Sequence, residues 1–235
     1  MSLAVKICGA TTEGDVQMLA ASGADLVGLW HGIPGGGKDL SVPEVTMLAA
    51  AARRTERLQP VLVTFINDPN VLLEVLAHTG VQWIQLHAYQ PPGVIRALKV
   101  GASVHLTVVK VLHVRDGECV ERPLIQSYQR AGTDLFLLDR TTENGQVGST
   151  GRRLAGSVVT GLADRMSVPF MLAGGISADN RTDYNAVAEH PLFFGIDVDS
   201  GARDADGELQ TERVTAIARG WQAVRGTEPT AAASA

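Results

Sequence analysis

The sequence predicts an α/β fold in which a single (β/α)8 barrel, a TIM barrel, takes up nearly the whole chain. Short runs rich in β-branched and apolar residues alternate with segments of helical spacing, and Gly, Pro and Asp separate them. Eight such runs are each followed by one helical segment, which is typical of parallel strands joined by helices. The length of 235 residues fits one barrel, because these barrels are commonly single domains of about 200–250 residues.

The elements follow one another in a regular order. The predicted strands lie near residues 4–8, 25–30, 60–65, 82–87, 104–112, 134–139, 168–172 and 193–198. The predicted helices lie near residues 12–22, 43–55, 69–79, 91–99, 120–131, 152–165, 179–189 and 210–224. Val42-Pro43 and Asp68-Pro69 mark two helix starts, since proline suits the first helical turn and aspartate caps it.

Composition limits the domain organisation and the partners. Residues 1–225 are predicted to form the barrel domain, and residues 226–235 are small and polar like a disordered C-terminal tail. The net charge of −5 comes without a basic stripe, so we expect no nucleic-acid partner. The first residues lack a basic region followed by a long apolar one, and no apolar run approaches a membrane span. We therefore expect a cytoplasmic protein with no membrane partner.

The chain has two cysteines, Cys8 and Cys119. Two cysteines are too few for a disulfide framework, and they show no metal-ligand spacing. Cys119 follows the fifth predicted strand and is expected to be incidental. Cys8 is expected to be a free thiol with a chemical role, and no metal site is predicted.

Chemistry in a parallel barrel is expected where the strands end, because the loops that follow them converge there. Strand ends supply Cys8, His87, Asp139 and Asp197. Lys6 shares a strand face with Cys8 at about 6–7 Å along the strand, so it is expected to favour the thiolate. The alternative interpretations are structural: Cys8 as a small buried apolar residue, Asp139 as a turn or cap residue, and His87 as a group that orients its neighbours.

Glycine-rich loops predict a phosphate site. In barrels, the loops after the seventh and eighth strands and a helix N-terminus often bind a phosphate. Here those loops carry Gly174-Gly175 and Ser200-Gly201, and the segment 148–151, ending in Gly151, is expected to belong to the same cradle. The glycine run 35–37 is either a flexible connector or, through Lys38, a loop that grips the substrate.

Several of these residues form a pattern known from one family. The motifs are Lys6-Ile7-Cys8-Gly9 with Thr11, Gln85-Leu86-His87, Leu137-Leu138-Asp139, Gly148 to Gly151, Leu172-Ala173-Gly174-Gly175, and Gly195-Ile196-Asp197-Val198 before Ser200-Gly201. In this order, over roughly residues 3–222, the chain resembles phosphoribosylanthranilate isomerase of tryptophan biosynthesis, a barrel of the ribulose-phosphate-binding type.

The resemblance implies an aldose-ketose isomerase, an intramolecular oxidoreductase. It would catalyse the Amadori rearrangement of N-(5′-phosphoribosyl)anthranilate to 1-(2-carboxyphenylamino)-1-deoxyribulose 5-phosphate without a metal or organic cofactor. It implies Cys8 as general base and Asp139 as general acid. We further expect Lys38, His87 and Asp197 to bind the phosphorylated sugar-amine substrate, and Gly151, Gly174, Gly175, Ser200 and Gly201 to bind its phosphate. The protein is expected to be a monomer or a homodimer.

The sequence departs from the family pattern at the loop after the second strand. The family carries an arginine there that grips the anthranilate carboxylate, and this chain has Lys38, which keeps the charge but lacks the two-donor fork. Asp199 stands where a small residue is usual, and it would repel a phosphate unless it paired with a cation such as Arg203. Two alternatives follow: a paralogue acting on a different N-glycoside in another, secondary-metabolic pathway, or a catalytically silent sugar-phosphate-binding barrel.

Overall fold

The computed structural model describes residues 2–35, 37–140 and 153–222. Its strands are β1 Ala4–Cys8, β2 Leu26–Trp30, β3 Gln59–Thr64, β4 Trp83–Leu86, β5 Thr107–Arg115, β6 Glu118–Cys119, β7 Leu135–Arg140, β8 Phe170–Leu172 and β9 Phe193–Val198. Its α-helices are α1 Glu13–Ala21, α2 Val42–Arg54, α3 Pro69–Thr79, α4 Pro92–Gly101, α5 Ile125–Ala131, α6 Gly156–Ala163, α7 Asn185–Ala188 and α8 Thr211–Gln222. Short 3₁₀ helices cover Arg122–Leu124, Ala178–Tyr184 and Ser200–Ala202.

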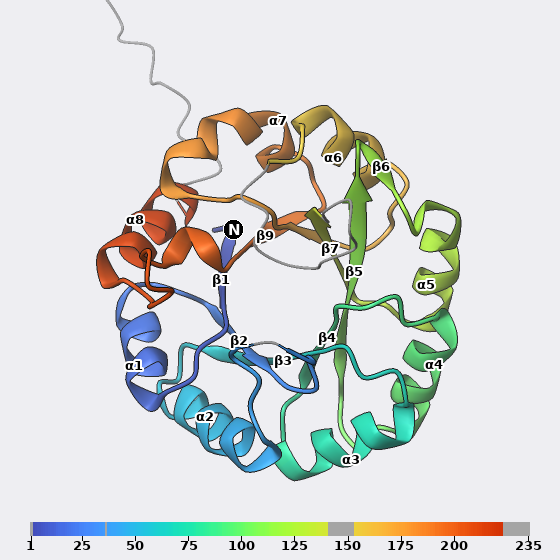
Figure 1. Ribbon diagram of the computed structural model, residues 1–235. Helices are drawn as coiled ribbons and strands as arrows, with labels where there is room; N and C mark the ends of the chain where they lie inside the picture. Colours follow the sequence, from blue (N-terminus) through green and yellow to red (C-terminus); the bar gives the residue numbers. More distant parts are fainter. Residues whose placement is uncertain (1, 36, 141–152, 223–235) are drawn as a thin grey trace, which may run out of the picture.

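The strands close into a barrel. Their order is β4-β3-β2-β1-β9-β8-β7-β5, and β4 pairs with β5 to complete the ring. All these pairings are parallel, and the helices surround the ring (Figure 1). The predicted (β/α)8 barrel is therefore confirmed. No helix in the described ranges is long and apolar enough to cross a membrane.

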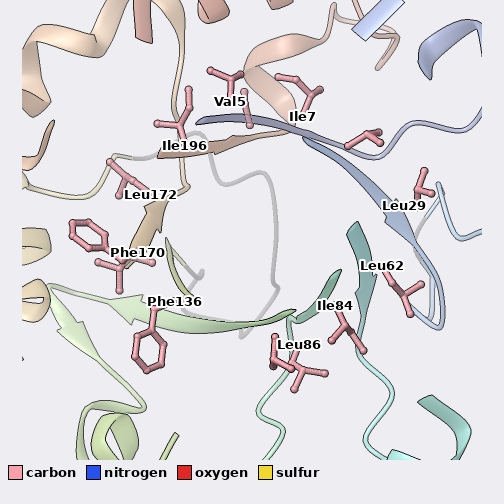
Figure 2. Close-up of a cluster of buried hydrophobic side chains, with 14 of the residues drawn as sticks. Val5, Ile7, Leu29, Leu62, Ile84, Leu86, Phe136, Phe170, Leu172 and Ile196 are labelled. Atoms are coloured by element: carbon pink, nitrogen blue, oxygen red, sulfur yellow. The ribbon is translucent and has the colours of Figure 1, made fainter. Parts of the chain in front are cut away.

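Successive side chains along each strand point to opposite faces of the sheet and so form two separate buried layers. Side chains such as Val5, Ile7, Phe136 and Ile196 point from the strands toward the helices (Figure 2), where they form the main hydrophobic core. A second cluster, which includes Val111, lies on other strand positions of β5, β7 and β8. Because the period is two, Lys6 and Cys8 point to the face opposite Val5 and Ile7, into the barrel. The strand register thus places the reactive side chains of Lys6 and Cys8 in the barrel interior.

Local signals explain where several helices begin. Thr12 and Asp15 form a capping box at the start of α1, and Ser41 and Glu44 form another before α2. Asp68 caps α3 through the Asn70 N–H. The predicted boundaries of these helices agree with the structure to within a residue or two.

Three predicted elements differ from the structure. Strand β5 starts at Thr107 and continues to Arg115, because a tight turn at Asp116-Gly117, both with positive φ, folds β6 back against it. Cys119 therefore lies in this small hairpin and not in a loop or helix start. The predicted helices 120–131 and 179–189 each begin as a 3₁₀ segment before a short α-helix. Gly151 and the predicted tail 226–235 lie outside the described residues.

Candidate active site

One pocket lies at the C-terminal ends of the barrel strands. Its lining residues come from the ends of β1, β2, β4, β7, β8 and β9 and from the loops that follow: Cys8, Trp30, His87, Asp139, Arg140, Ala173, Gly174, Gly175, Ile176, Asp197, Val198, Asp199, Ser200 and Gly201. The structure thus brings together the strand-end residues and the two glycine loops singled out in the sequence. Lys38 is absent from this lining but contacts its edge.

The Cys8 thiol sits between two donors. The Trp30 indole donates a hydrogen bond to Sγ at 3.0 Å, and the Lys6 ammonium lies 3.4 Å from it. A Cβ on Gly28 would come within 2.5 Å of Sγ, so the neighbouring strand leaves just enough room for the sulfur. Burial raises the pKa of Cys8 to about 11; Lys6 and Trp30 lower it, while Asp197 and Asp199 raise it further.

Lys6 favours the thiolate, as the sequence predicts, because it lowers the pKa of Cys8. Burial outweighs this effect, and Lys6 has a closer partner, the Asp197 carboxylate at 2.7 Å. Both side chains are almost fully buried, with 2% and 6% of their surface exposed. Burial alone would lower the pKa of Lys6, but Asp197 and Cys8 together raise it above its ordinary value. Lys6 is thus a permanent cation beneath the thiol.

The two carboxylate oxygens of Asp197 differ in their hydrogen-bond partners. Oδ2 accepts the bond from Lys6, whereas Oδ1 is buried and has no hydrogen-bond partner within the described residues. Because Asp197 lines the pocket, this oxygen is placed to accept a hydrogen bond from a bound molecule.

Asp139 and His87 form the other side of the pocket. Asp139 Oδ1 accepts the Arg140 backbone N–H at 2.8 Å, and Oδ2 lies 3.3 Å from His87 Nε2 without an aligned hydrogen bond. Gln85 Nε2 lies 3.1 Å from His87 Nδ1 and holds the ring in place. Burial lowers the pKa of His87, although Asp139 opposes that shift, so the imidazole is neutral at pH 7.

Behind His87 lies a cluster of buried polar side chains that was not predicted from the sequence. His113 Nε2 lies 3.0 Å from the His87 carbonyl oxygen, and its Nδ1 lies 2.5 Å from Glu121 Oε1. Lys110 donates to the Ala88 carbonyl at 2.6 Å, and burial lowers its pKa to about 8. These bonds fix the loop after β4. Nothing in the sequence pattern points to them, since they depend on β5 and the β6 hairpin meeting that loop.

The two glycine loops meet at the rim. Gly174 and Gly175 both have positive φ, which glycine adopts freely. A Cβ on Gly201 would come within 2.2 Å of the Ile176 carbonyl oxygen, so the loop after β9 packs directly on the loop after β8. Ser200 and Gly201 begin a short 3₁₀ turn at this contact. The rim therefore presents backbone to the pocket at close range.

Asp199 neighbours two cations. Lys38 Nζ and Arg203 Nε lie 2.9 Å and 2.7 Å from the same oxygen, Oδ1. The pairing of Asp199 with Arg203 that the sequence suggested is present. Arg203 also donates to the Cys8 and Gly9 carbonyls, a role the sequence did not suggest.

Trp30 was not among the site residues predicted from the sequence. It ends the second predicted strand, so the strand-end rule would have found it.

Within the described ranges, no group of three or more His, Cys, Asp or Glu side chains is arranged to hold a metal ion. Fold and site together define the class: a (β/α)8-barrel enzyme with ionisable side chains converging at its C-terminal mouth. The family model described as N-(5'phosphoribosyl)anthranilate (PRA) isomerase matches residues 5–218. The chain belongs to this PRA isomerase family.

Individual relatives agree with this assignment. The chain is 32% identical over 226 residues to the N-(5'-phosphoribosyl)anthranilate isomerase of Myxococcus xanthus, covering 95% of this chain and 98% of the relative. The crystal structure of phosphoribosyl anthranilate isomerase from Thermotoga maritima superposes with a TM-score of 0.75 at 24% identity, covering 94% of this chain and all of that one. A solved isomerase in complex with reduced 1-(o-carboxyphenylamino)-1-deoxyribulose 5-phosphate has a TM-score of 0.72 at 22% identity, with 94% and 100% coverage.

Proposed function

We propose that this protein catalyses the Amadori rearrangement of N-(5′-phosphoribosyl)anthranilate to 1-(2-carboxyphenylamino)-1-deoxyribulose 5-phosphate, with Asp139 as general acid and Cys8 as general base. The observation that carries the proposal is the convergence of these two groups on one pocket whose rim holds the Gly174-Gly175 and Ser200-Gly201 loops. Membership of the PRA isomerase family supports the same reaction.

The reaction needs one acid and one base. Asp139 protonates the furanose ring oxygen, so that the C1′–O bond breaks and the nitrogen lone pair forms an iminium. Cys8 then removes the C2′ proton, the electrons shift to form the enamine, and tautomerisation gives the ketose. Each proton transfer can contribute about 10²–10⁴-fold to the rate when the group lies within hydrogen-bond reach.

The surroundings of Cys8 suit a strong but rarely formed base. With a pKa of about 11, only about one thiol in 10³ is ionised at pH 8 in the free protein. The Trp30 N–H and the Lys6 ammonium supply two hydrogen bonds to the sulfur, and both stabilise the thiolate once it forms. A thiolate of high pKa is a correspondingly strong proton acceptor for a carbon acid.

The two sides of the pocket suit the two ends of this substrate. Cys8, Ile33 and Val63 form an apolar cluster with Trp30 and Phe65 beside β1 to β3, which favours an aromatic ring. The glycine loops lie beside β8 and β9, where backbone groups can approach a phosphate. Lys38 lies over the Trp30 ring, 5.3 Å from its centroid, and is the proposed partner of the ring carboxylate.

His87 and Asp197 complete the proposed substrate contacts. The neutral His87 ring beside Asp139 positions the acid without adding a charge. The unpartnered Asp197 Oδ1 is the proposed acceptor for a ribose hydroxyl. All of these described groups come from one chain, so a monomer and a homodimer would each hold them.

The test follows the fluorescence of freshly generated N-(5′-phosphoribosyl)anthranilate, which also hydrolyses spontaneously. We expect rapid enzyme-dependent loss, with Cys8→Ala and Asp139→Asn each lowering kcat by at least about 10². Cys119→Ala and Asp183→Asn are the matched controls, because Cys119 lies in the β6 hairpin and Asp183 is a half-exposed partner of Arg153. Wild-type activity in either site variant would contradict the assigned role.

A second candidate function rests on Lys38. Because Asp199 already pairs with this cation, a paralogue that rearranges an N-glycoside lacking the ring carboxylate is the alternative. No turnover of the anthranilate substrate, with turnover of the corresponding phosphoribosyl aniline, would favour this alternative. A silent sugar-phosphate-binding barrel would turn over neither.

A further inference from the structure

The strongest unexplained feature is the arrangement of Lys38, Asp199 and Arg203 at the edge of the pocket. Both cations approach one oxygen of Asp199, at 2.9 Å from Lys38 and 2.7 Å from Arg203. The Lys38 and Asp199 side chains are about one-fifth exposed, at 23% and 20%, whereas Arg203 is nearly buried at 8%. Asp199 is thus held between a fixed cation and a more accessible one.

The two cations differ in what else they do. Arg203 donates to the carbonyls of Cys8, Gly9 and Gly207, so its position is set by the backbone around β1 and the loop after β9. Among the described residues, Lys38 donates a hydrogen bond only to Asp199. Arg203 is therefore a structural partner of Asp199, and Lys38 is the partner that can be exchanged.

Lys38 reaches Asp199 by crossing the end of β1. A Cβ on Gly9 would come within 2.8 Å of Lys38 Cδ, so the absence of a side chain at Gly9 gives the lysine its path. Along this path the ammonium lies over the Trp30 ring, beside the apolar cluster that includes Cys8. Lys38 is thus on the aromatic side of the pocket, whereas Ser200 and Gly201 continue from Asp199 toward the glycine rim.

From this geometry we propose that Asp199 competes with the substrate's ring carboxylate for Lys38 and thereby sets how tightly the enzyme binds that carboxylate. The inference rests on the proposed function. When the substrate carboxylate approaches Lys38, the Lys38–Asp199 pair opens and a new pair of the same kind forms. Asp199 keeps its bond to Arg203, so the displaced carboxylate stays paired.

The energetic consequence is specific to one part of the ligand. Opening a partly buried ion pair offsets most of what the new pair contributes, so the ring carboxylate adds little to affinity while Asp199 is present. The phosphate does not use Lys38 in this scheme, so its contribution is independent of the competition. Asp199 is in this sense a specificity-determining residue that makes the enzyme tolerant of substrates without the carboxylate.

The test measures Kd by calorimetry for two ligands and several full-length variants. The probes are reduced 1-(o-carboxyphenylamino)-1-deoxyribulose 5-phosphate and its counterpart without the ring carboxylate. We expect Asp199→Asn to tighten binding of the first by about three- to tenfold and to leave the second within about twofold. Adding Lys38→Met to Asp199→Asn should abolish this gain. Asp206→Asn, an exposed carboxylate on the same loop, is the control for the change in net charge.

Each other outcome overturns the inference. If both probes bind Asp199→Asn more tightly by the same factor, Asp199 acts on the phosphate and not through Lys38. If neither Kd changes, there is no competition. If wild type binds neither probe and shows no turnover, the proposed function itself is wrong, a result distinct from unchanged affinities. Asp199→Ser repeats the comparison with a smaller side chain, and a thermal melt of each variant reports whether it folds.

Discussion

Replacing Lys6 by methionine should destabilise the barrel strongly, because it leaves Asp197 charged and alone in the interior. The Lys6 and Asp197 side chains are 2% and 6% exposed and lie 2.7 Å apart. Asp197 Oδ1 already has no partner among the described residues, so without Lys6 the carboxylate would lose the cation that compensates its charge. Methionine keeps the length and the apolar stem of lysine, so packing is nearly preserved.

The expected loss is about 3–5 kcal/mol, the cost typical of removing one partner of a buried ion pair. With a urea m-value of about 3 kcal/mol/M, the unfolding midpoint should fall by about 1–1.7 M. The double variant Lys6→Met/Asp197→Asn removes both charges and should recover at least about 2 kcal/mol of the loss. In Asp197→Asn alone, Lys6 keeps its contact with the Cys8 thiol. The stability loss of this variant is the last value needed for the double-mutant cycle.

The assay is equilibrium urea unfolding followed by far-UV circular dichroism and by tryptophan fluorescence, with reversibility checked for each variant. Coincident transitions with the two probes would justify a two-state analysis. A midpoint for Lys6→Met within 0.3 M of wild type, or a double variant less stable than Lys6→Met, would refute the reasoning. Either result would mean that the carboxylate becomes protonated or hydrated at little cost.

Three further predictions concern the thiol and the strand packing. In a Cys119→Ala background, the rate of Cys8 alkylation by iodoacetamide should rise about tenfold per pH unit until pH approaches the thiol pKa of about 11. A rate that reaches a plateau by pH 9 would contradict the conclusion that burial raises this pKa. Trp30→Phe removes a donor that stabilises the thiolate, so the alkylation profile and the rise of kcat/KM with pH should both move to higher pH, and an unmoved profile would show a purely structural role. Gly195→Ala should cost more than about 3 kcal/mol, since its Cβ would lie 2.0 Å from the Ala4 carbonyl oxygen; a wild-type melting temperature would be inconsistent with that packing.

Most of the fold could be predicted because local patterns agree with the barrel. The strands 4–8 and 193–198 match the structure residue for residue, since each is a short, mainly apolar run that ends just before a glycine or a polar residue, Gly9 or Asp199. Strand β5 was placed three residues too early, because its end is set by the β6 hairpin and not by its own apolar run. The segment 179–189 has helical spacing, yet most of it forms a 3₁₀ helix whose Tyr184 hydroxyl and Asn180 amide bond to neighbouring loops.

The residues of the candidate site could be predicted from the sequence, but the protonation state of Cys8 could not. The strand-end rule placed Cys8, His87, Asp139 and Asp197 at one mouth, and the pocket contains all four. It could not give the state of Cys8, because the pKa depends on burial and on Trp30, which arrives from the next strand. Their catalytic and binding roles stay predictions until the variants are measured.

Local sequence patterns specify the barrel, the strands that build it and the residues at their C-terminal ends, because period-two alternation and local capping are properties of neighbouring residues. The pairing of the charges depends on the tertiary structure. Lys6 meets Asp197 across 191 positions of sequence and Lys38 meets Asp199 across 161. Such pairs exist because closure of the ring brings β9 beside β1 and the loop after β2 over that seam, and no local pattern encodes the contact.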